Sequence, residues 1–174
     1  MSTYRILVES LPSAVCFVHM TSLSLPEATS VVRTTASVNG VELQPPQVAQ
    51  LIDAFSQCPL PLYLRICVHE AKRLRSFELL PALPADTPAL IAEVFFQRLE
   101  VAFGAVFVAH ALAYITACVE GLSQTELEDV LSCDEAVLDS LFLNWMPPVR
   151  RLPPLLWTRI REALGPFLVR IIEK

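Results

Sequence analysis

The stretch that decides the fold is GLSQTELEDVLSCDEAVL, residues 121–138. Ser123 stands three residues before Glu126, and Ser132 stands three residues before Glu135, which is the spacing of a capping box at the start of a helix. The stretch therefore predicts two short helices in succession, the first ending near residue 131 and the second near residue 144. Such a pair resembles a helix-turn-helix element.

The run that precedes this element is unusually apolar. Residues 101–119, VAFGAVFVAHALAYITACV, carry no charge except a possible one on His110. Gly121 suits the end of such a helix, and nineteen residues just reach transmembrane length. The polar residue Thr116, the flexible Gly104 and the lack of an adjacent basic cluster argue against membrane insertion. We expect a helix buried on all sides in a soluble core, with a membrane span as the alternative.

This buried helix should pack on apolar residues of the two short helices, namely Leu127, Val130, Leu131, Leu138 and Leu141. The second short helix should bury Val137, Leu138, Leu141 and Phe142. If the apolar helix is enclosed, an arginine at Ala113 leaves an unpaired buried charge and unfolds the C-terminal half.

A last helix is expected over residues 155–164, where Leu156, Ile160 and Leu164 align on one face. Trp157 lies inside this segment. We expect its indole to anchor the helix on the preceding core, with the ring N–H bonded to an acceptor.

The N-terminal part begins with two strand candidates, residues 4–8 and 15–18. Ser24 and Glu27 then have capping-box spacing, which predicts a helix that runs to about Val38. Another helix should start at residues 45–46, with an apolar stripe of Val48, Leu51, Ile52 and Phe55. A third is expected from Leu62 to about Arg75, and its inward residues should be Leu62, Ile66 and Ala71.

Residues 81–88 form a proline-rich connection, the best internal boundary in the chain. Thr87 and Pro88 suit the N-cap and first position of a helix over residues 89–103. The predicted fold is mainly α, with a short β segment at the N-terminus and a small wing near the C-terminus.

Composition narrows the function classes. The chain has 174 residues, 53% of them hydrophobic and 18% charged, and a net charge of −5. Nucleic-acid binding needs clustered cations, so we exclude it as a general role. Residues 120–139 are acidic and residues 146–174 basic, which predicts two faces that attract each other, with a polyanion site at the tail as the alternative. The five cysteines suggest reduced thiols and a cytoplasmic protein.

No phosphate-binding loop, dinucleotide fingerprint, zinc-protease motif or nucleophile elbow occurs in the sequence. Folding could bring Cys67 and His110 together as a nucleophile and base. This candidate is weak, because cysteines in apolar helices are usually structural. The acidic run Glu126–Asp129 is more typical of a helix surface than of a metal site. We therefore expect no autonomous active site, no metal and no enzymatic activity.

Three stretches carry a family resemblance. Residues 58–64 (CPLPLYL), with Glu70–Ala71 and Ser76, resemble the segment after the nucleotide core of NACHT-type signalling NTPases. Residues 121–127 (GLSQTEL) and onward resemble their winged-helix region. Residues 152–161 (LPPLLWTRIR), followed by Leu164–Gly165–Pro166, look like the subgroup that carries WD repeats after the NTPase.

The resemblance implies a division of the chain. Residues 1–22 would be a remnant of the NTPase core containing its sensor strand, residues 23–80 the helical domain, and residues 88–174 the winged-helix domain. The phosphate-binding core would lie upstream and the WD repeats downstream, so the chain looks like an internal piece of a longer protein. No residue of the winged-helix part is carried over as a nucleotide sensor, because no histidine follows His110.

The same resemblance implies one cofactor-contacting residue. In such proteins a proline in a G-L-P-L-like motif packs near the adenine of bound ATP or ADP, and Pro61, followed by Leu62, matches that position. The match is partial, because Leu60 precedes it and Pro59 or Cys58 stands where the family has glycine. A plain helix-start proline is the other interpretation of Pro61.

The leading functional hypothesis is a regulatory helical and winged-helix portion of a NACHT-type NTPase, which helps to enclose nucleotide and relays conformational change. The alternatives are a free-standing helical adaptor that binds another protein, or a small membrane protein anchored by residues 101–119.

Overall fold

The computed structural model describes residues 23–38, 40–143 and 147–169, which are mainly α-helical. The two predicted N-terminal strands lie outside the described residues. No β-strand occurs in the described ranges, so the expected wing is not a strand pair there. The elements are α2 (Leu25–Val38), α3 (Pro45–Gln57), α4 (Pro61–Ala71), α5 (Thr87–Ala89), η1 (Leu90–Phe96), α6 (Gln97–Phe103), α7 (Ala105–Ala117), α8 (Gln124–Ser132), α9 (Glu135–Leu141), α10 (Pro154–Leu164) and η2 (Gly165–Phe167).

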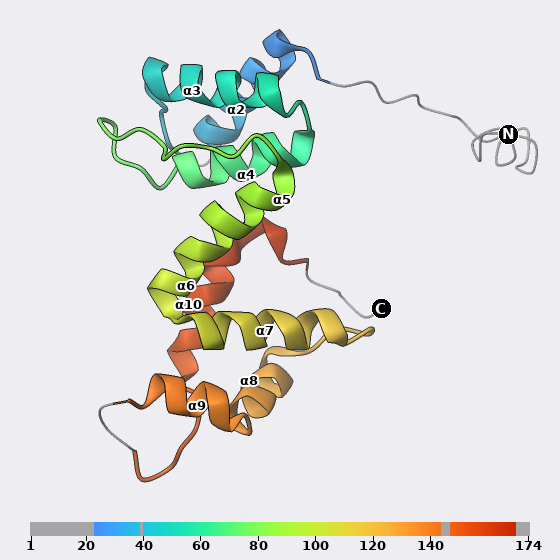
Figure 1. Cartoon of the computed structure of the whole chain (residues 1–174), viewed down its shortest axis with the longest axis vertical. Coiled ribbons are helices and arrows are strands. Elements are labelled where there is room, and N and C mark those ends of the chain that lie inside the picture. Colours follow the sequence, from blue (N-terminus) through green and yellow to red (C-terminus); the bar gives the residue numbers. More distant parts are fainter. Residues whose placement is uncertain (1–22, 39, 144–146, 170–174) are drawn as a thin grey trace, which may run out of the picture.

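The helices form two groups joined by a long helical stem. Helices α2, α3 and α4 gather at one end of the molecule, and α7, α8 and α9 gather at the other (Figure 1). The continuous segment α5–η1–α6 leads from the first group to the second, and α10 runs back beside α6. One hydrophobic core extends through both groups, because buried residues from each group, from the stem and from α10 belong to a single cluster.

Local sequence signals explain the first group. The Ser24 backbone N–H donates to Glu27 Oε2 at 2.8 Å, which confirms the predicted start of α2. In α3 the predicted stripe is also confirmed, since Leu51 and Phe55 are almost fully buried and Ile52 is half-buried.

The third predicted helix is shorter than expected, and one of its inward residues is wrong. Helix α4 ends at Ala71 rather than near Arg75. The buried Gln47 side chain of α3 donates to the backbone carbonyls of Arg75 and Glu78, at 3.0 and 2.8 Å, and holds the following residues in a turn. Leu62 is 48% exposed, because the buried face of α4 passes beside it through Tyr63, Leu64, Cys67, Val68 and Ala71.

The N-cap of the stem is Asp86 rather than Thr87. Asp86 Oδ1 accepts a hydrogen bond from the Ala89 N–H at 2.7 Å, and Thr87 and Pro88 are the first two helical residues. The predicted helix over residues 89–103 is confirmed, although Leu90–Phe96 has the wider π-type turn.

The single apolar helix predicted over residues 101–119 is broken in two. Gly104 has φ +94°, and the helical segments on either side of it, Thr87–Phe103 and Ala105–Ala117, meet at 116°. A residue with a Cβ adopts this backbone only with strain, so glycine marks the corner. Among the described residues no single helix is long and apolar enough to cross a membrane, and this bent pair meets the length and composition test only when both parts are taken together.

The expectation that this segment is buried on all sides is also wrong. In α7 only Phe107, Val108 and Ala111 are buried, whereas Ala113 is exposed and Val119 is 97% exposed. Helices α8 and α9 cover one side of α7, and its outward side carries mainly alanines. Gly121 does not cap the helix, because α7 ends at Ala117 and Cys118 is its C-cap.

The predicted pair of short helices is confirmed, with one cap displaced. Ser123 and Glu126 form the capping box of α8 as expected. Helix α9, however, is capped by Asp134, whose Oδ1 accepts from the Val137 N–H at 3.2 Å. Ser132 is instead the last residue of α8, and its hydroxyl accepts from the Leu152 N–H. Of the residues expected beneath α7, Leu127, Leu131 and Leu138 are buried, whereas Leu141 is half-buried and Val130 is 38% exposed.

The last helix packs as predicted. Trp157, Ile160 and Leu164 of α10 are buried at 4%, 0% and 4% exposure, and Leu156 is half-buried. The acceptor expected for the indole N–H stays a prediction. The attraction between the acidic and basic stretches is confirmed, because Arg150 bonds Glu135 at 2.8 Å and Asp139 at 2.5 Å, and Arg151 pairs with Asp129.

Candidate functional site

Pro61, the predicted nucleotide-contacting residue, is the first residue of α4 and is exposed. Its N-cap, Leu60, has extended backbone and gives no side-chain hydrogen bond to the first turn. Leu60 and Leu62 on either side are 52% and 48% exposed. The beginning of α4 is therefore an open apolar edge with an uncapped helix N-terminus.

The residues behind this edge tie it to the stem. The Tyr63 hydroxyl donates to the Pro84 carbonyl oxygen at 2.7 Å. Before α4 begins, Cys58 Sγ, at the C-cap of α3, lies 3.6 Å from the Thr87 hydroxyl at the start of α5. Both contacts are buried or partly buried, so the start of α4 is fixed to the start of the stem and to the residues that lead into it.

At the opposite end of α4, a partly buried ion pair joins the first group of helices to the stem. Arg98 of α6 donates from Nε and Nη2 to the two carboxylate oxygens of Glu70, at 2.7 and 3.0 Å. The Glu70 side chain is only 7% exposed. Burial alone would raise the pKa of this carboxyl, but its hydrogen bonds with His69 and Arg98 outweigh burial and hold the pKa below its usual value. Glu70 is therefore a carboxylate at neutral pH.

The same arginine reaches a third element. Arg98 Nη2 also lies 3.4 Å from the Ala163 carbonyl oxygen near the end of α10. A groove of about 620 Å³ adjoins the pair, between the end of α4, the proline-rich connection and the stem, and its walls include Arg73 and Glu93. Arg98 thus links α4, α6 and α10 at one point.

An aromatic cluster continues this junction. His69 of α4 meets Phe95 of the stem and Phe167 of η2 edge to face, with ring centroids 5.9 and 5.2 Å apart. Arg65 lies over the Phe167 ring at 5.4 Å and donates to the Pro166 carbonyl oxygen at 3.0 Å. We call the contacts of Arg65, His69 and Glu70 with Phe95, Arg98 and residues 163–167 the seam.

Sequence reasoning missed the seam, although one signal was present. In the sequence, Glu70 belongs to a stretch that carries the family resemblance, and no pattern assigns a role to His69. Arg98 is the only lysine or arginine between residues 76 and 149, and it lies inside a mainly apolar helical segment whose other charged residues, Glu93 and Glu100, are acidic. A lone cation in such a position predicts a buried acidic partner, but the sequence does not say which carboxylate supplies it.

The pair of Cys67 with His110, considered from sequence, is not formed. Cys67 is fully buried in α4, and burial raises the pKa of its thiol to about 12, so the reactive thiolate is not available at neutral pH. His110 lies in α7, where its Nδ1 is 2.6 Å from Asp134 Oδ2. Within residues 23–38, 40–143 and 147–169, no three His, Cys, Asp or Glu side chains are grouped to hold a metal ion.

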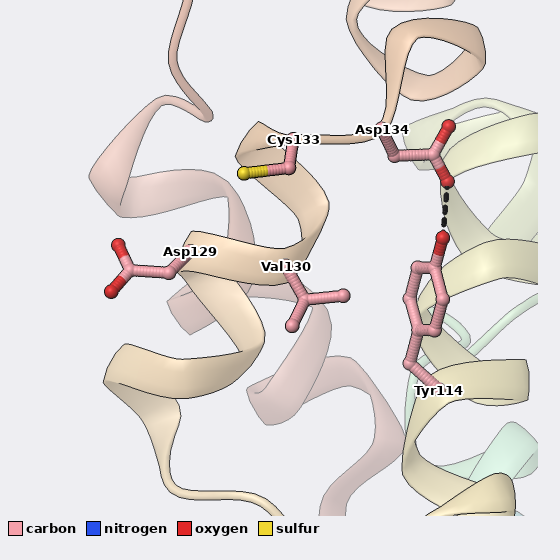
Figure 2. A pocket seen from close by; sticks show the side chains of 5 residues that line it. All are labelled: Tyr114, Asp129, Val130, Cys133 and Asp134. Atoms are coloured by element: carbon pink, nitrogen blue, oxygen red, sulfur yellow. Dashed lines mark hydrogen bonds between the residues drawn. The ribbon is translucent and has the colours of Figure 1, made fainter.

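The helix-turn-helix element has its own polar cluster. Tyr114 of α7 donates to Asp134 Oδ2 at 2.6 Å across a shallow pocket of about 370 Å³, as Figure 2 shows. Val130 and Cys133 of the α8–α9 segment line the same pocket. Hydrogen bonds from Tyr114, and then with His110, hold the pKa of Asp134 at about 2. Asp134 therefore caps α9 and fastens it to α7, which is a structural role.

Comparison with known proteins agrees with the resemblance found in the sequence. A family model described as an NWD1-like, winged helix-turn-helix domain matches residues 90–174. NACHT domain- and WD repeat-containing protein 1 is 41% identical over 131 residues in Mus musculus and 39% identical in Homo sapiens, in each case over 74% of this chain and 8% of the relative. NACHT and WD repeat domain-containing protein 2 of Mus musculus is 36% identical over 67% of this chain and 7% of its own length.

No solved structure matches the chain. The chain spans less than a tenth of the length of the curated relatives it matches. Helices α6 to α10, which surround the seam and the Asp134 cluster, all lie in the segment matched by the winged-helix family. The chain therefore belongs to the NACHT and WD repeat domain-containing protein family, and it contains the winged helix-turn-helix domain of that family.

Proposed function

We propose that this chain is a regulatory portion of a NACHT protein that helps to enclose a nucleotide and passes a conformational change to the segments beyond it. The observation that carries the proposal is the seam. One short helix, α4, has an exposed proline at its first residue, and near its last residue the Glu70–Arg98 pair fastens it to the winged-helix segment.

The start of α4 fits one wall of a nucleotide site. Pro61 presents an exposed ring suited to the face of an adenine, and Leu60 and Leu62 add apolar surface beside it. Proline lacks an N–H, and the remaining free N–H groups of an uncapped helix N-terminus favour nearby phosphate charge. The other walls would come from an upstream NTPase core, so we expect this chain alone to bind ATP or ADP weakly or not at all.

The relay follows from the stiffness of α4. A shift imposed at Pro61 moves the whole helix, because its interior is packed and its backbone hydrogen bonds are made within one element. At the far end the shift reaches Glu70, and through Arg98 it reaches both the stem and α10. We infer a population shift between two packings of the seam, with no chemical step in this chain.

The surrounding architecture is part of the proposal. The relatives' names give NACHT domains and WD repeats, so we infer that an NTPase core precedes this segment and WD repeats follow it, as its partners in one protein. We also place the protein in the cytoplasm, where the thiols of the buried Cys58 and Cys67 stay reduced. ATP hydrolysis would belong to the upstream core.

The test measures release of ADP from a full-length NACHT and WD repeat protein that carries this segment. Pro61→Ala and Pro61→Glu should both speed release, the glutamate more strongly because it repels the phosphates. Pro59→Ala is the matched control, since Pro59 is an exposed proline two residues earlier, in the loop before α4. Release rates of both Pro61 variants equal to that of the wild type would reduce Pro61 to a helix-start residue and overturn the enclosure proposal.

A further inference from the structure

Ser76 lies at the tip of a tight turn directly after α4. The Glu78 N–H donates to the Arg75 carbonyl oxygen at 3.0 Å, which makes Ser76 and Phe77 the two central residues of a β-turn. Both residues are exposed, Phe77 at 77%. Within the part of the chain that the structure describes, the Ser76 hydroxyl has no hydrogen-bond partner. The hydroxyl is therefore accessible and chemically uncommitted.

The residues before this serine are cationic. Lys72, Arg73 and Arg75 precede it within four positions, and Ser76 is the only serine or threonine in the sequence with an arginine three positions before it. Arg73 and Arg75 are exposed, and neither guanidinium forms an ion pair among the described residues. The inner part of the Arg73 side chain borders the groove, and this partial burial together with repulsion from Arg98 lowers its pKa, so an added anion beside it would be favourable. Such a cluster stands out in a chain of net charge −5.

We propose that Ser76 is a phosphorylation site for a protein kinase that selects arginine three positions before the acceptor serine. In the reaction the Ser76 hydroxyl oxygen attacks the γ-phosphorus of ATP. The new O–P bond forms as the bond between the γ-phosphorus and the bridging oxygen of ADP breaks, and the hydroxyl proton passes to the catalytic base of the kinase. The products are phosphoserine and ADP, and Arg73 is the specificity-determining residue on this chain.

Access to the serine is controlled by α3. A kinase binds its substrate segment in an extended form, so the turn must open before transfer. Gln47, only 2% exposed, holds the carbonyls of Arg75 and Glu78, and the Arg75 N–H donates to the Glu78 carboxylate at 2.9 Å. Loosening the Gln47 contacts should make Ser76 a better substrate without changing the residues next to it in the sequence.

The phosphate would change the charge balance beside the seam. It brings about two negative charges and three acceptor oxygens to a turn flanked by Arg73 and Arg75, which can form charge-assisted hydrogen bonds with it. The same charge repels the Glu78 carboxylate and weakens its bond to the Arg75 N–H. Arg73 borders the groove that adjoins Glu70 and Arg98, so the modification acts next to the seam without touching it. This inference does not depend on the nucleotide proposal.

The test incubates the whole chain with ATP and a purified serine/threonine kinase known to require arginine three positions before the acceptor. The site is located by mass spectrometry of peptides, and the initial rate is measured. We expect one phosphate on Ser76, none in Ser76→Ala, and a rate at least tenfold lower for Arg73→Ala. Arg33→Ala is the matched control, because Arg33 is an exposed arginine of α2, and its rate should equal that of the wild type.

Two further variants test the turn. Gln47→Leu should raise the rate of phosphorylation several-fold. Glu78→Ala should raise it as well, and it serves if Gln47→Leu unfolds, because it leaves α3 unchanged. Absence of phosphate on Ser76 in the wild type, or equal rates for Arg73→Ala and the wild type, would overturn the site. Unchanged rates in a folded Gln47→Leu and in Glu78→Ala would overturn the control by α3.

Discussion

At Gly165 the backbone and a neighbouring side chain together require glycine. This residue follows α10 with φ +56° and ψ −127°, and an added Cβ would lie 3.0 Å from His69 Nε2. Gly165→Ala should therefore destabilise the fold by more than the roughly 1–2 kcal/mol that a left-handed backbone costs a residue with a Cβ. Chemical unfolding measures the difference.

Gly40→Ala is the control for backbone strain alone, because Gly40 has φ +70° and no atom within 4 Å of an added Cβ. Equal losses of stability in the two alanine variants would show that His69 moves aside freely and that the seam is loosely packed.

Asp134 should make the free energy of unfolding depend on pH in the acidic range. Its pKa is about 2 in the folded chain, below the usual value of 3.8, because Tyr114 and His110 bond its carboxylate. A lowered folded pKa means that the stabilisation is complete above about pH 4 and is lost as the pH falls towards 2. Asp134→Asn keeps a side chain that caps α9 but removes the titration.

Urea midpoints of the wild type and Asp134→Asn, measured from pH 2 to pH 7, check this prediction. The wild type should be more stable above pH 4 by on the order of 1–2 kcal/mol, a figure that allows for partial solvent screening, and the two proteins should converge near pH 2. A difference that stays constant over the whole range would remove Asp134 as the source of the acid dependence.

Helix caps show where the sequence alone identifies the capping residue and where it does not. Ser24 with Glu27 and Ser123 with Glu126 were predicted correctly, because one competent residue stands at each helix start. Before α9, Ser132 and Asp134 are both able to cap the helix, and they stand two positions apart. The choice depends on Leu152, whose N–H donates to the Ser132 hydroxyl from the remote segment before α10, and local spacing does not contain that contact.

Among the elements, α7 departs furthest from the prediction. Its run of alanines is equally compatible with a helix enclosed on all sides and with one that is covered on a single side, so the apolar pattern alone cannot fix its exposure. The corner at Gly104 then turns α7 across the end of the stem, which leaves one face of the helix uncovered (Figure 1).

Two arginine substitutions separate the faces of α7. Ala113 is exposed, so Ala113→Arg should change the free energy of unfolding by less than about 0.5 kcal/mol, contrary to the expectation from sequence. Ala111 is 0% exposed, and Ala111→Arg should unfold the C-terminal helices because it buries an unpaired charge. Circular dichroism on heating measures both. A large loss in Ala113→Arg together with a small loss in Ala111→Arg would reverse the assigned orientation of the helix.

For the whole molecule, the order and type of the helices were largely predictable, and the junction between them was not. Capping boxes, prolines and apolar stripes are local signals, and they located nearly every helix of the described residues. The seam instead joins Glu70 to Arg98 and Arg98 to Ala163, residues that lie far apart along the chain. Such contacts depend on how complete helices pack. Pro61 could be singled out from the family resemblance, whereas its connection to the seam through α4 required the structure.

The central claim is that the seam transmits the state of the nucleotide edge to the winged-helix segment. The most direct test is the rate of ADP release from a full-length NACHT and WD repeat protein carrying Glu70→Gln, a change that keeps the side-chain size but removes the charge opposite Arg98. Arg151→Ala, which breaks an exposed ion pair outside the seam, is the control. We predict roughly tenfold faster release for Glu70→Gln, because weakening the pair changes the free-energy difference between the resting and open states by about 1.4 kcal/mol. Arg151→Ala should release ADP at the wild-type rate. Release from Glu70→Gln at the wild-type rate would contradict the account.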